Sequence, residues 1–226
     1  MEIETGKLAG VEAFVRWPHA VHGMLGPSDI IPVVEQAGLH VEFDRWVVGA
    51  ICRQAKKWRV DGFAVPVVAA NVWSETLRRP DALRLIDALA ETGVDPRTIE
   101  LECPRGSTVD PELTKALVAI QALGVRLASE EYASGARPRW ILSFDTLKIP
   151  YPISRDHVAN ADAIVAVVRE ARSNGARVIA DSVESVEQEQ ALAALGVKMV
   201  QGYLYGPEVT PAELRTLMKE PGALSA

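Results

Sequence analysis

The chain has 226 residues, 48% hydrophobic and 24% charged, which is the size and composition of one large globular domain with an ample core. Its net charge of −6 argues against nonspecific binding to nucleic-acid polymers or anionic membranes. The two cysteines, Cys52 and Cys103, form no CxxC pair, so we expect a reduced, cytoplasmic protein. The first ten residues are too polar for a signal peptide, and no apolar run reaches the roughly 18 residues of a membrane span.

Strand-like and helix-like segments alternate along the chain. Short apolar runs predict strands at 10–16, 65–71, 98–102, 125–129, 145–149, 177–181 and 198–201. Helical spacing of apolar residues predicts helices at 29–38, 43–58, about 80–92, 111–124, 156–174, 186–195 and from Pro211 onward. This alternation with short connections indicates parallel βα units with right-handed crossovers. No low-complexity linker interrupts the pattern, so residues 1–226 are expected to form a single domain.

The end signals are clearest around the helix at 111–124. Asp110 is the expected N-cap, Pro111 occupies the first helical position, and Gly124 ends the helix. Residues 130–140 are too rich in Gly, Pro and Ser to form regular structure. The chain supplies seven barrel-type strands, whereas a closed α/β barrel needs eight. We therefore expect the missing strand to be one that precedes the strand at 10–16.

Each of the seven apolar runs carries or ends on a polar residue. These residues are Glu12, Asn71, Glu102, Glu130, Lys148, Asp181 and Gln201. Because the C-terminal ends of parallel strands meet on one face, where ligands bind, we expect these side chains to form a site. The alternative for any one of them is a helix cap or a partner for a surface base. That alternative weakens when the pattern repeats, because crowded like charges are destabilising unless something neutralises them.

The predicted site is rich in oxygen donors. Mg²⁺ and similar hard cations prefer carboxylate and amide oxygens, and two such ions can clamp the attacking and leaving oxygens of a phosphodiester. The donors are Glu12, Asn71, Glu102, Glu130, Glu131 and Asp181. Lys148 would add positive charge near the developing phosphorane. The histidines show no ligand spacing, and no GxSxG, GxGxxG or GxxxxGK[ST] motif occurs.

The order of motifs resembles the EAL domain, the family of cyclic di-GMP phosphodiesterases and their degenerate relatives. The matching segments are VEAFVRW (11–17), GMLGPSDIIPVVEQAGL (23–39), NVWSETLRRP (71–80), IELECPRG (99–106), GVRLASEEYASG (124–135), LKIP (147–150), IADSVES (179–185) and VQGYLYGP (200–207). The resemblance implies an α/β fold of modified TIM (β/α)8-barrel type, here without the first helix and most of the first strand.

The resemblance also implies residue roles. Glu12, Asn71, Glu102 and Glu130 would bind one Mg²⁺ or Mn²⁺ ion, and Glu131 and Asp181 would serve a second metal and the attacking water. Lys148 matches the family's catalytic lysine, Glu184 an acid that orients the site, and Gln201 a contact near the water. Arg16 matches a residue that contacts the dinucleotide phosphate. Trp17 is the best candidate for a pocket wall.

Several positions depart from the family pattern. The paired aspartates have become Glu130-Glu131, and an acid of the Glu-Gly-Val-Glu motif has become Asp181. Each swap moves a carboxylate by about one methylene, which can cost roughly a hundredfold in rate. A glycine is lost from the loop after Glu131, Pro104-Arg105 replaces a Thr-Glu pair, and Pro150 replaces an aspartate. These changes favour loss of efficient hydrolysis.

Three functions follow from this reading. The first is a catalytically impaired module of cyclic di-GMP signalling. It would bind the dinucleotide weakly as a receptor, or regulate through a protein partner or homodimer, and it could act without a metal cofactor. The second is an active phosphodiesterase that uses Mg²⁺ or Mn²⁺ to open cyclic di-GMP to pGpG, since every acid position still holds an acid. The third is a scaffold without ligand chemistry, since fold does not fix function.

Overall fold

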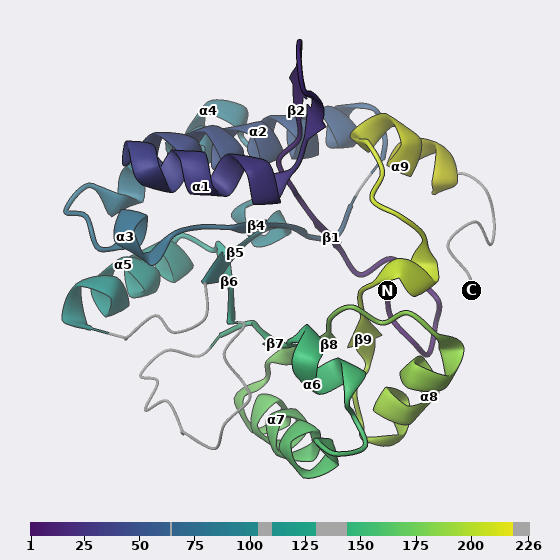
Figure 1. The fold of residues 1–226 in the computed structure, drawn as a ribbon. Helices are drawn as coiled ribbons and strands as arrows, with labels where there is room; N and C mark the ends of the chain where they lie inside the picture. The colour runs from purple at the N-terminus through teal and green to yellow at the C-terminus, as the bar shows by residue number, and fades with distance from the viewer. Residues whose placement is uncertain (64, 104–109, 130–143, 219–226) are drawn as a thin grey trace. The chain divides into compact units, whose positions relative to one another are not determined.

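The protein is described by a computed structural model that covers residues 1–63, 65–103, 110–129 and 144–218 (Figure 1). Two compact units make up the chain. Residues 10–126 form one unit, and residues 1–9 together with 127–226 form the other. Both units contain parallel strands with helices between them, so the predicted alternation of strands and helices is confirmed.

Three parallel strands form the centre of unit 10–126. They are β1 (Val11–Glu12), β4 (Val68–Asn71) and β5 (Ile99–Cys103), in that order. The helices are α1 (Pro27–Ala37), α2 (His40–Val60), α3 (Ser74–Leu77), α4 (Asp87–Thr92) and α5 (Pro111–Ala122), with 3₁₀ helices η1 (Ala82–Ile86) and η2 (Pro96–Thr98). Helix α2 packs on β4, α4 and η1. The core of this unit includes the fully buried Val48, Leu77, Ile99 and Leu101.

Among its described residues, the other unit has four parallel strands, the first of which begins at the border residue Arg126. They are β6 (Arg126–Ser129), β7 (Thr146–Ile149), β8 (Arg177–Ala180) and β9 (Met199–Val200), in that order. The helices are α6 (Tyr151–Arg155), α7 (Ala161–Asn174), α8 (Val186–Ala194) and α9 (Pro211–Leu217), with 3₁₀ helix η3 (Tyr203–Tyr205). Helix α7 packs on β7 and β8 (Figure 1).

The first residues of the chain pair with the last of these strands. Glu2 forms an isolated antiparallel bridge with Met199, and the backbones of Met1 and Val200 exchange hydrogen bonds. Within residues 1–10 this bridge is the only regular structure, and no helix precedes β1.

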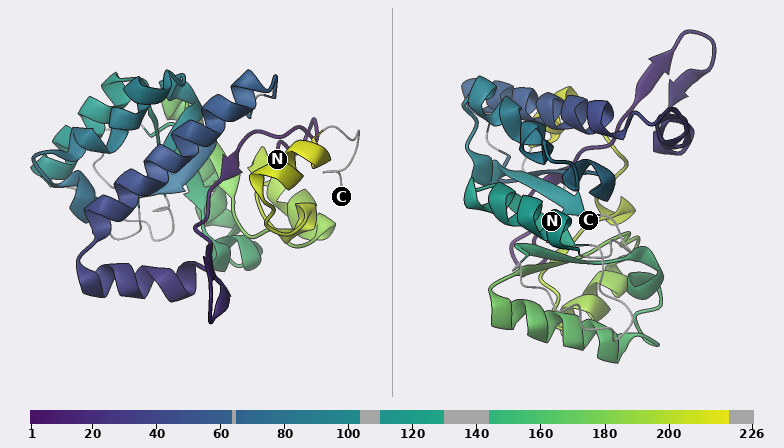
Figure 2. Two further views of the ribbon diagram at one scale, coloured as in Figure 1. Left: turned by 90° about the horizontal axis from the view of Figure 1, so that it is seen from above. Right: turned by 90° about the vertical axis from the view of Figure 1, so that its left-hand side faces the viewer.

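Some predicted boundaries differ from the structure. The strand expected at 10–16 ends at Glu12, and a hairpin of β2 (Trp17–His19) and β3 (Gly23–Leu25) follows it. Figure 2 shows this hairpin extending away from β1, β4 and β5. The helix expected at 156–174 begins only at Ala161, because both the backbone and the side-chain amide of Asn160 donate to the Asp156 carbonyl in a turn.

Two further differences concern short helices. The helix expected at about 80–92 is divided into η1 and α4, and the four-residue α3 directly after β4 was not predicted. Among the described residues, no helix combines the length and the hydropathy that crossing a membrane requires.

Candidate functional site

Three of the predicted ligands lie together at the ends of strands β1, β4 and β5. Asn71 and Glu102 are direct neighbours in the parallel register. The Asn71 side-chain amide donates a hydrogen bond of 2.7 Å to Oε1 of Glu12. The backbone N–H of Val72 donates to the carbonyl of Glu102 at 3.1 Å. Side-chain and backbone contacts thus link all three strand ends.

The three side chains differ in exposure. Glu102 is only 2% exposed, Glu12 is half-buried, and Asn71 is exposed. Burial, and then the charge of Glu102, raise the pKa of the neighbouring Cys103 thiol to about 12, so this cysteine stays a neutral thiol. Two carboxylates and one amide form an all-oxygen donor set, which fits a hard divalent cation such as Mg²⁺ or Mn²⁺.

A buried acid that was not predicted from the sequence supports the segment after Asn71. Asp44 of α2 is completely buried, and its Oδ2 accepts a hydrogen bond of 3.0 Å from the backbone N–H of Trp73. Burial is the main cause that raises its pKa to about 7; the Thr76 hydroxyl and the Trp73 amide lower it, and the charge of Glu75 raises it further.

Arg16 and Trp17 lie at the start of the hairpin in the same unit. The Arg16 guanidinium donates from Nη1 to the carbonyl of Val15 at 2.8 Å. Trp17 is 52% exposed, and its ring meets the His19 ring edge-on at 4.8 Å between centroids. The roles expected for both residues stay predictions.

In the other unit, three predicted residues lie at the ends of neighbouring strands. Lys148 lies in β7 and is 2% exposed. The Asp181 amide donates to the Ile149 carbonyl, and the Gln201 amide to the Ala180 carbonyl, both at 2.9 Å. This backbone pairing continues the register of β7, β8 and β9 beyond the strands. It therefore places Lys148, Asp181 and Gln201 at their C-terminal ends.

The segment after Asp181 has an unusual backbone. Ser182 adopts a left-handed φ of 57°, the only positive φ outside glycine among the described residues. Its N–H donates to Oδ1 of Asp181 at 2.7 Å, while the Asp181 carbonyl accepts from the Ser154 hydroxyl at 2.6 Å. These contacts hold the loop that carries Asp181 in one conformation, at the cost of strain at Ser182.

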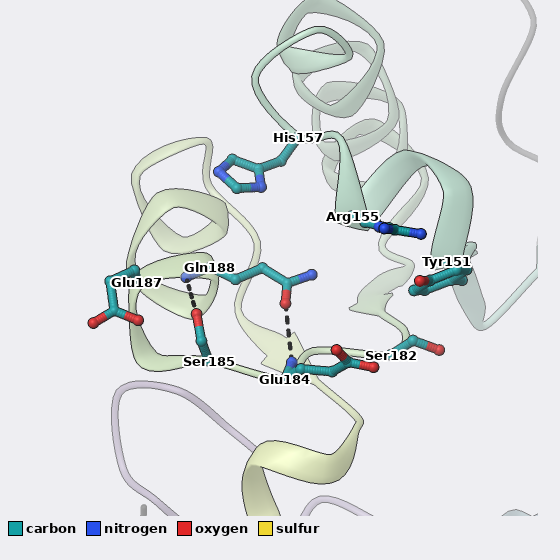
Figure 3. Close-up of a pocket in the computed structure, with 8 residues that line it drawn as sticks. All are labelled: Tyr151, Arg155, His157, Ser182, Glu184, Ser185, Glu187 and Gln188. Atoms are coloured by element: carbon teal, nitrogen blue, oxygen red, sulfur yellow. Dashed lines mark hydrogen bonds between the residues drawn. The ribbon is translucent and has the colours of Figure 1, made fainter.

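A pocket of about 340 Å³ lies beside this loop. Figure 3 shows its lining residues: Tyr151, Arg155, His157, Ser182, Glu184, Ser185, Glu187 and Gln188. The Glu184 amide donates to Oε1 of Gln188 at 2.9 Å, and the Arg155 guanidinium lies 5.5 Å from the centre of the Tyr151 ring. Of these residues only Glu184 was predicted from the sequence, because the others follow no strand end directly or carry no metal-binding group.

Glu130 and Glu131 lie outside the described residues, so their predicted metal-binding role stays a prediction. Within the described parts of the chain, no group of three or more His, Cys, Asp or Glu side chains is arranged to hold a metal ion. Glu12, Asn71 and Glu102 provide only two acids to such a group. The structure therefore describes only part of the donor set that the sequence predicts.

Comparison with known proteins identifies the family. Residues 1–208 match the sequence model of the EAL domain. The chain belongs to the EAL domain family. A curated relative of this EAL domain is MucR of Pseudomonas aeruginosa, a bifunctional diguanylate cyclase/cyclic di-GMP phosphodiesterase. MucR is 30% identical, and the match covers 92% of this chain and 32% of the length of MucR. The oxygen sensor protein DosP of Escherichia coli is 28% identical over 93% of this chain and 27% of its own length. The chain thus spans about a third or less of these relatives.

Solved structures show the same fold. The phosphodiesterase PaMucR in its c-di-GMP complex has a TM-score of 0.81 and 25% identity, covering 91% of this EAL domain and 87% of that chain. A manganese and cyclic di-GMP complex of Klebsiella pneumoniae BlrP1 has a TM-score of 0.77 and 22% identity, covering 92% of this EAL domain and 53% of that chain. These likenesses confirm the predicted α/β fold of TIM-barrel type. BlrP1 was also solved as a calcium complex.

Proposed function

We propose that this EAL domain binds cyclic di-GMP together with Mg²⁺ or Mn²⁺ and acts as a receptor or protein-interaction regulator with impaired hydrolysis. One observation carries the binding part of the proposal: Glu12, Asn71 and Glu102 lie at neighbouring strand ends, with Asn71 donating to Glu12 at 2.7 Å. The complexes of PaMucR and BlrP1 support the choice of ligand and of a divalent cation. The free thiols of Cys52 and Cys103 suit the cytoplasmic location that we expect.

The residues of unit 10–126 would perform the binding. Glu12, Asn71 and Glu102 would hold the cation through their oxygens. A bound divalent cation supplies positive charge that neutralises and polarises the phosphodiester. The bond from the Asn71 amide nitrogen to Glu12 orients the amide, so that its oxygen points elsewhere and can act as a ligand. Arg16 would add a charge-assisted contact to a phosphate, and Trp17 an exposed aromatic face.

Impaired hydrolysis is supported by the sequence departures around the predicted catalytic groups. Glu130-Glu131 and Asp181 place their carboxylates at altered distances from the backbone, and chemistry is sensitive to shifts of about 1 Å. Ser182 stands where the resemblance has glycine and holds the left-handed φ that glycine adopts without strain. The receptor's signal would then pass through a protein partner or a homodimer.

An active phosphodiesterase that yields pGpG is the second candidate. It is favoured by Lys148, which is almost completely buried at the end of β7, and by Asp181 and Gln201 at the ends of the next two strands. A fixed cation and a fixed carboxylate are the groups that stabilise charge and position water in phosphoryl transfer. Glu184 would orient this arrangement from the edge of the pocket in Figure 3.

One experiment separates the candidates. The purified protein is incubated with cyclic di-GMP and Mg²⁺ or Mn²⁺ while the heat of binding and the linear product are followed in parallel. The proposal predicts binding without appreciable product. Product that disappears in a folded Lys148→Ala variant would contradict impaired hydrolysis and establish the phosphodiesterase. If neither binding heat nor linear product is observed, the scaffold function remains.

A further inference from the structure

The chain that leaves β4 is fixed immediately after Asn71. The N–H of Val72 donates to the carbonyl of Glu102 at 3.1 Å, and the next N–H, of Trp73, donates to Oδ2 of Asp44 at 3.0 Å. Two consecutive amides are therefore held by groups from two other elements, β5 and α2. The direction in which the backbone leaves Asn71 follows from these two bonds.

The Trp73 side chain is held against the same helices. Its indole Nε1 lies 3.4 Å from Oε1 of Glu35 on α1, to which it donates. Its ring meets those of His40 and Phe43 on α2 edge-on, at 5.1 and 5.6 Å between centroids. Edge-on aromatic pairs are favourable beyond their buried area. Trp73 is thus fixed to α1 and α2 through both its backbone and its ring.

The burial of Asp44 is energetically unfavourable. It is completely buried, and in the described part of the chain its Oδ1 makes no hydrogen bond. The Thr76 hydroxyl lowers the pKa of Asp44, but Oγ1 of Thr76 is itself buried without a hydrogen-bond partner in the described part of the chain. Burying a carboxyl group with one of its two oxygens unpaired costs free energy. The hydrogen bond that Asp44 accepts from the Trp73 amide offsets part of this cost.

We propose that Asp44 is a positioning residue for the Glu12–Asn71–Glu102 set. By accepting from the Trp73 amide, it fixes the backbone after Asn71 and so holds the Asn71 side chain against Glu12. The expected effect on ligand affinity rests on the proposed function. The effect on Asn71 itself does not, so the two can fail separately.

The test uses the fact that the chain has only three asparagines, Asn71, Asn160 and Asn174. Selective ¹⁵N-asparagine labelling gives three side-chain amide signals, and the signal of Asn71 reports its hydrogen bond to Glu12 in the ligand-free protein. Asp44→Ala is expected to shift this signal and to leave the other two in place. Asp44→Asn adds a fourth signal of its own and is expected to restore that of Asn71, because the amide oxygen of Asn can still accept from Trp73.

Val48→Ala is the matched control. Val48 lies one turn further along α2 and is also completely buried, so its truncation destabilises the same helix without removing the bond to Trp73. A signal of Asn71 that stays unchanged in Asp44→Ala, or that moves equally in Val48→Ala, overturns the proposal. If Asp44→Ala does not fold, Asp44→Ser takes its place, because its shorter side chain is expected not to reach the Trp73 amide.

Binding gives the second readout. With Mg²⁺ present, Asp44→Ala is expected to weaken calorimetric binding of cyclic di-GMP by roughly 10- to 100-fold, the usual effect of removing a group that orients a ligand residue. Asp44→Asn is expected to stay within about threefold of the unmodified protein on the same grounds. If the unmodified protein does not bind, the proposed function fails, while the asparagine signals still decide the role of Asp44.

Discussion

Replacing Asp44 by asparagine should change how the stability of the protein depends on pH. Burial raises the pKa of Asp44 from 3.8 to about 7, so the folded protein keeps a proton that the unfolded chain loses at lower pH. The contribution of Asp44 to stability is therefore largest below about pH 4 and falls as the pH rises to about 7. At 1.36 kcal/mol for each pKa unit, the whole decrease amounts to about 4 kcal/mol.

Urea unfolding at pH 5, 6, 7 and 8 measures this decrease. Between pH 5 and pH 8, the free energy of unfolding of the unmodified protein should fall by about 3 kcal/mol relative to that of Asp44→Asn, which has no proton to lose. Asp87→Asn, at an exposed acid, serves as the control and should show no such trend. A difference between the unmodified protein and Asp44→Asn that stays constant from pH 5 to pH 8 would show that Asp44 does not lose a proton in this range.

Three further predictions concern single residues. Gly202→Ala should destabilise the protein by roughly 3 kcal/mol or more in urea unfolding, because the added Cβ would lie 2.2 Å from the Val183 carbonyl oxygen. Gly206→Ala, also at positive φ but in open space, should cost clearly less, and equal costs would contradict the clash. Ser182→Gly should raise the free energy of unfolding by about 0.5–1 kcal/mol by relieving the left-handed φ of 57°, and a loss of stability would contradict the strain. Asp110→Ala should lower the urea midpoint at pH 7. The reason is that hydrogen bonds from the first turn of α5 and from Arg78 hold the pKa of Asp110 below its usual value. The contribution of Asp110 to stability is therefore present above about pH 4 and lost as the pH falls. An unchanged urea midpoint would contradict this contribution.

The strands, and the part of the candidate site that lies in unit 10–126, could be predicted from the sequence. Buried parallel strands appear as short apolar runs, so a polar residue that ends such a run stands out. Glu12, Asn71 and Glu102 were found in this way, and the register of β4 and β5 brings the last two together. The N-cap at Asp110 was also confirmed, because capping depends on residues only three positions apart.

Other features depend on contacts that apolar periodicity does not record. Asp44 interrupts the buried face of α2, and only the fold shows that it meets the Trp73 amide. The hairpin of β2 and β3 was missed because its residues are mostly exposed and alternate only weakly. The pocket in Figure 3 combines α6 with the loop after β8, which are separated by about 30 residues in the sequence.

We propose that cyclic di-GMP binds with a divalent cation at Glu12, Asn71 and Glu102 and is not efficiently hydrolysed. Calorimetric titration of cyclic di-GMP in the presence of Mn²⁺ tests it most directly, with Asn71→Ala compared to the surface control Asn174→Ala. We expect saturable heat for the unmodified protein and for Asn174→Ala, strongly reduced heat for Asn71→Ala, and no accumulation of linear dinucleotide. Equal heat from both variants, or no heat from the folded unmodified protein, would contradict it.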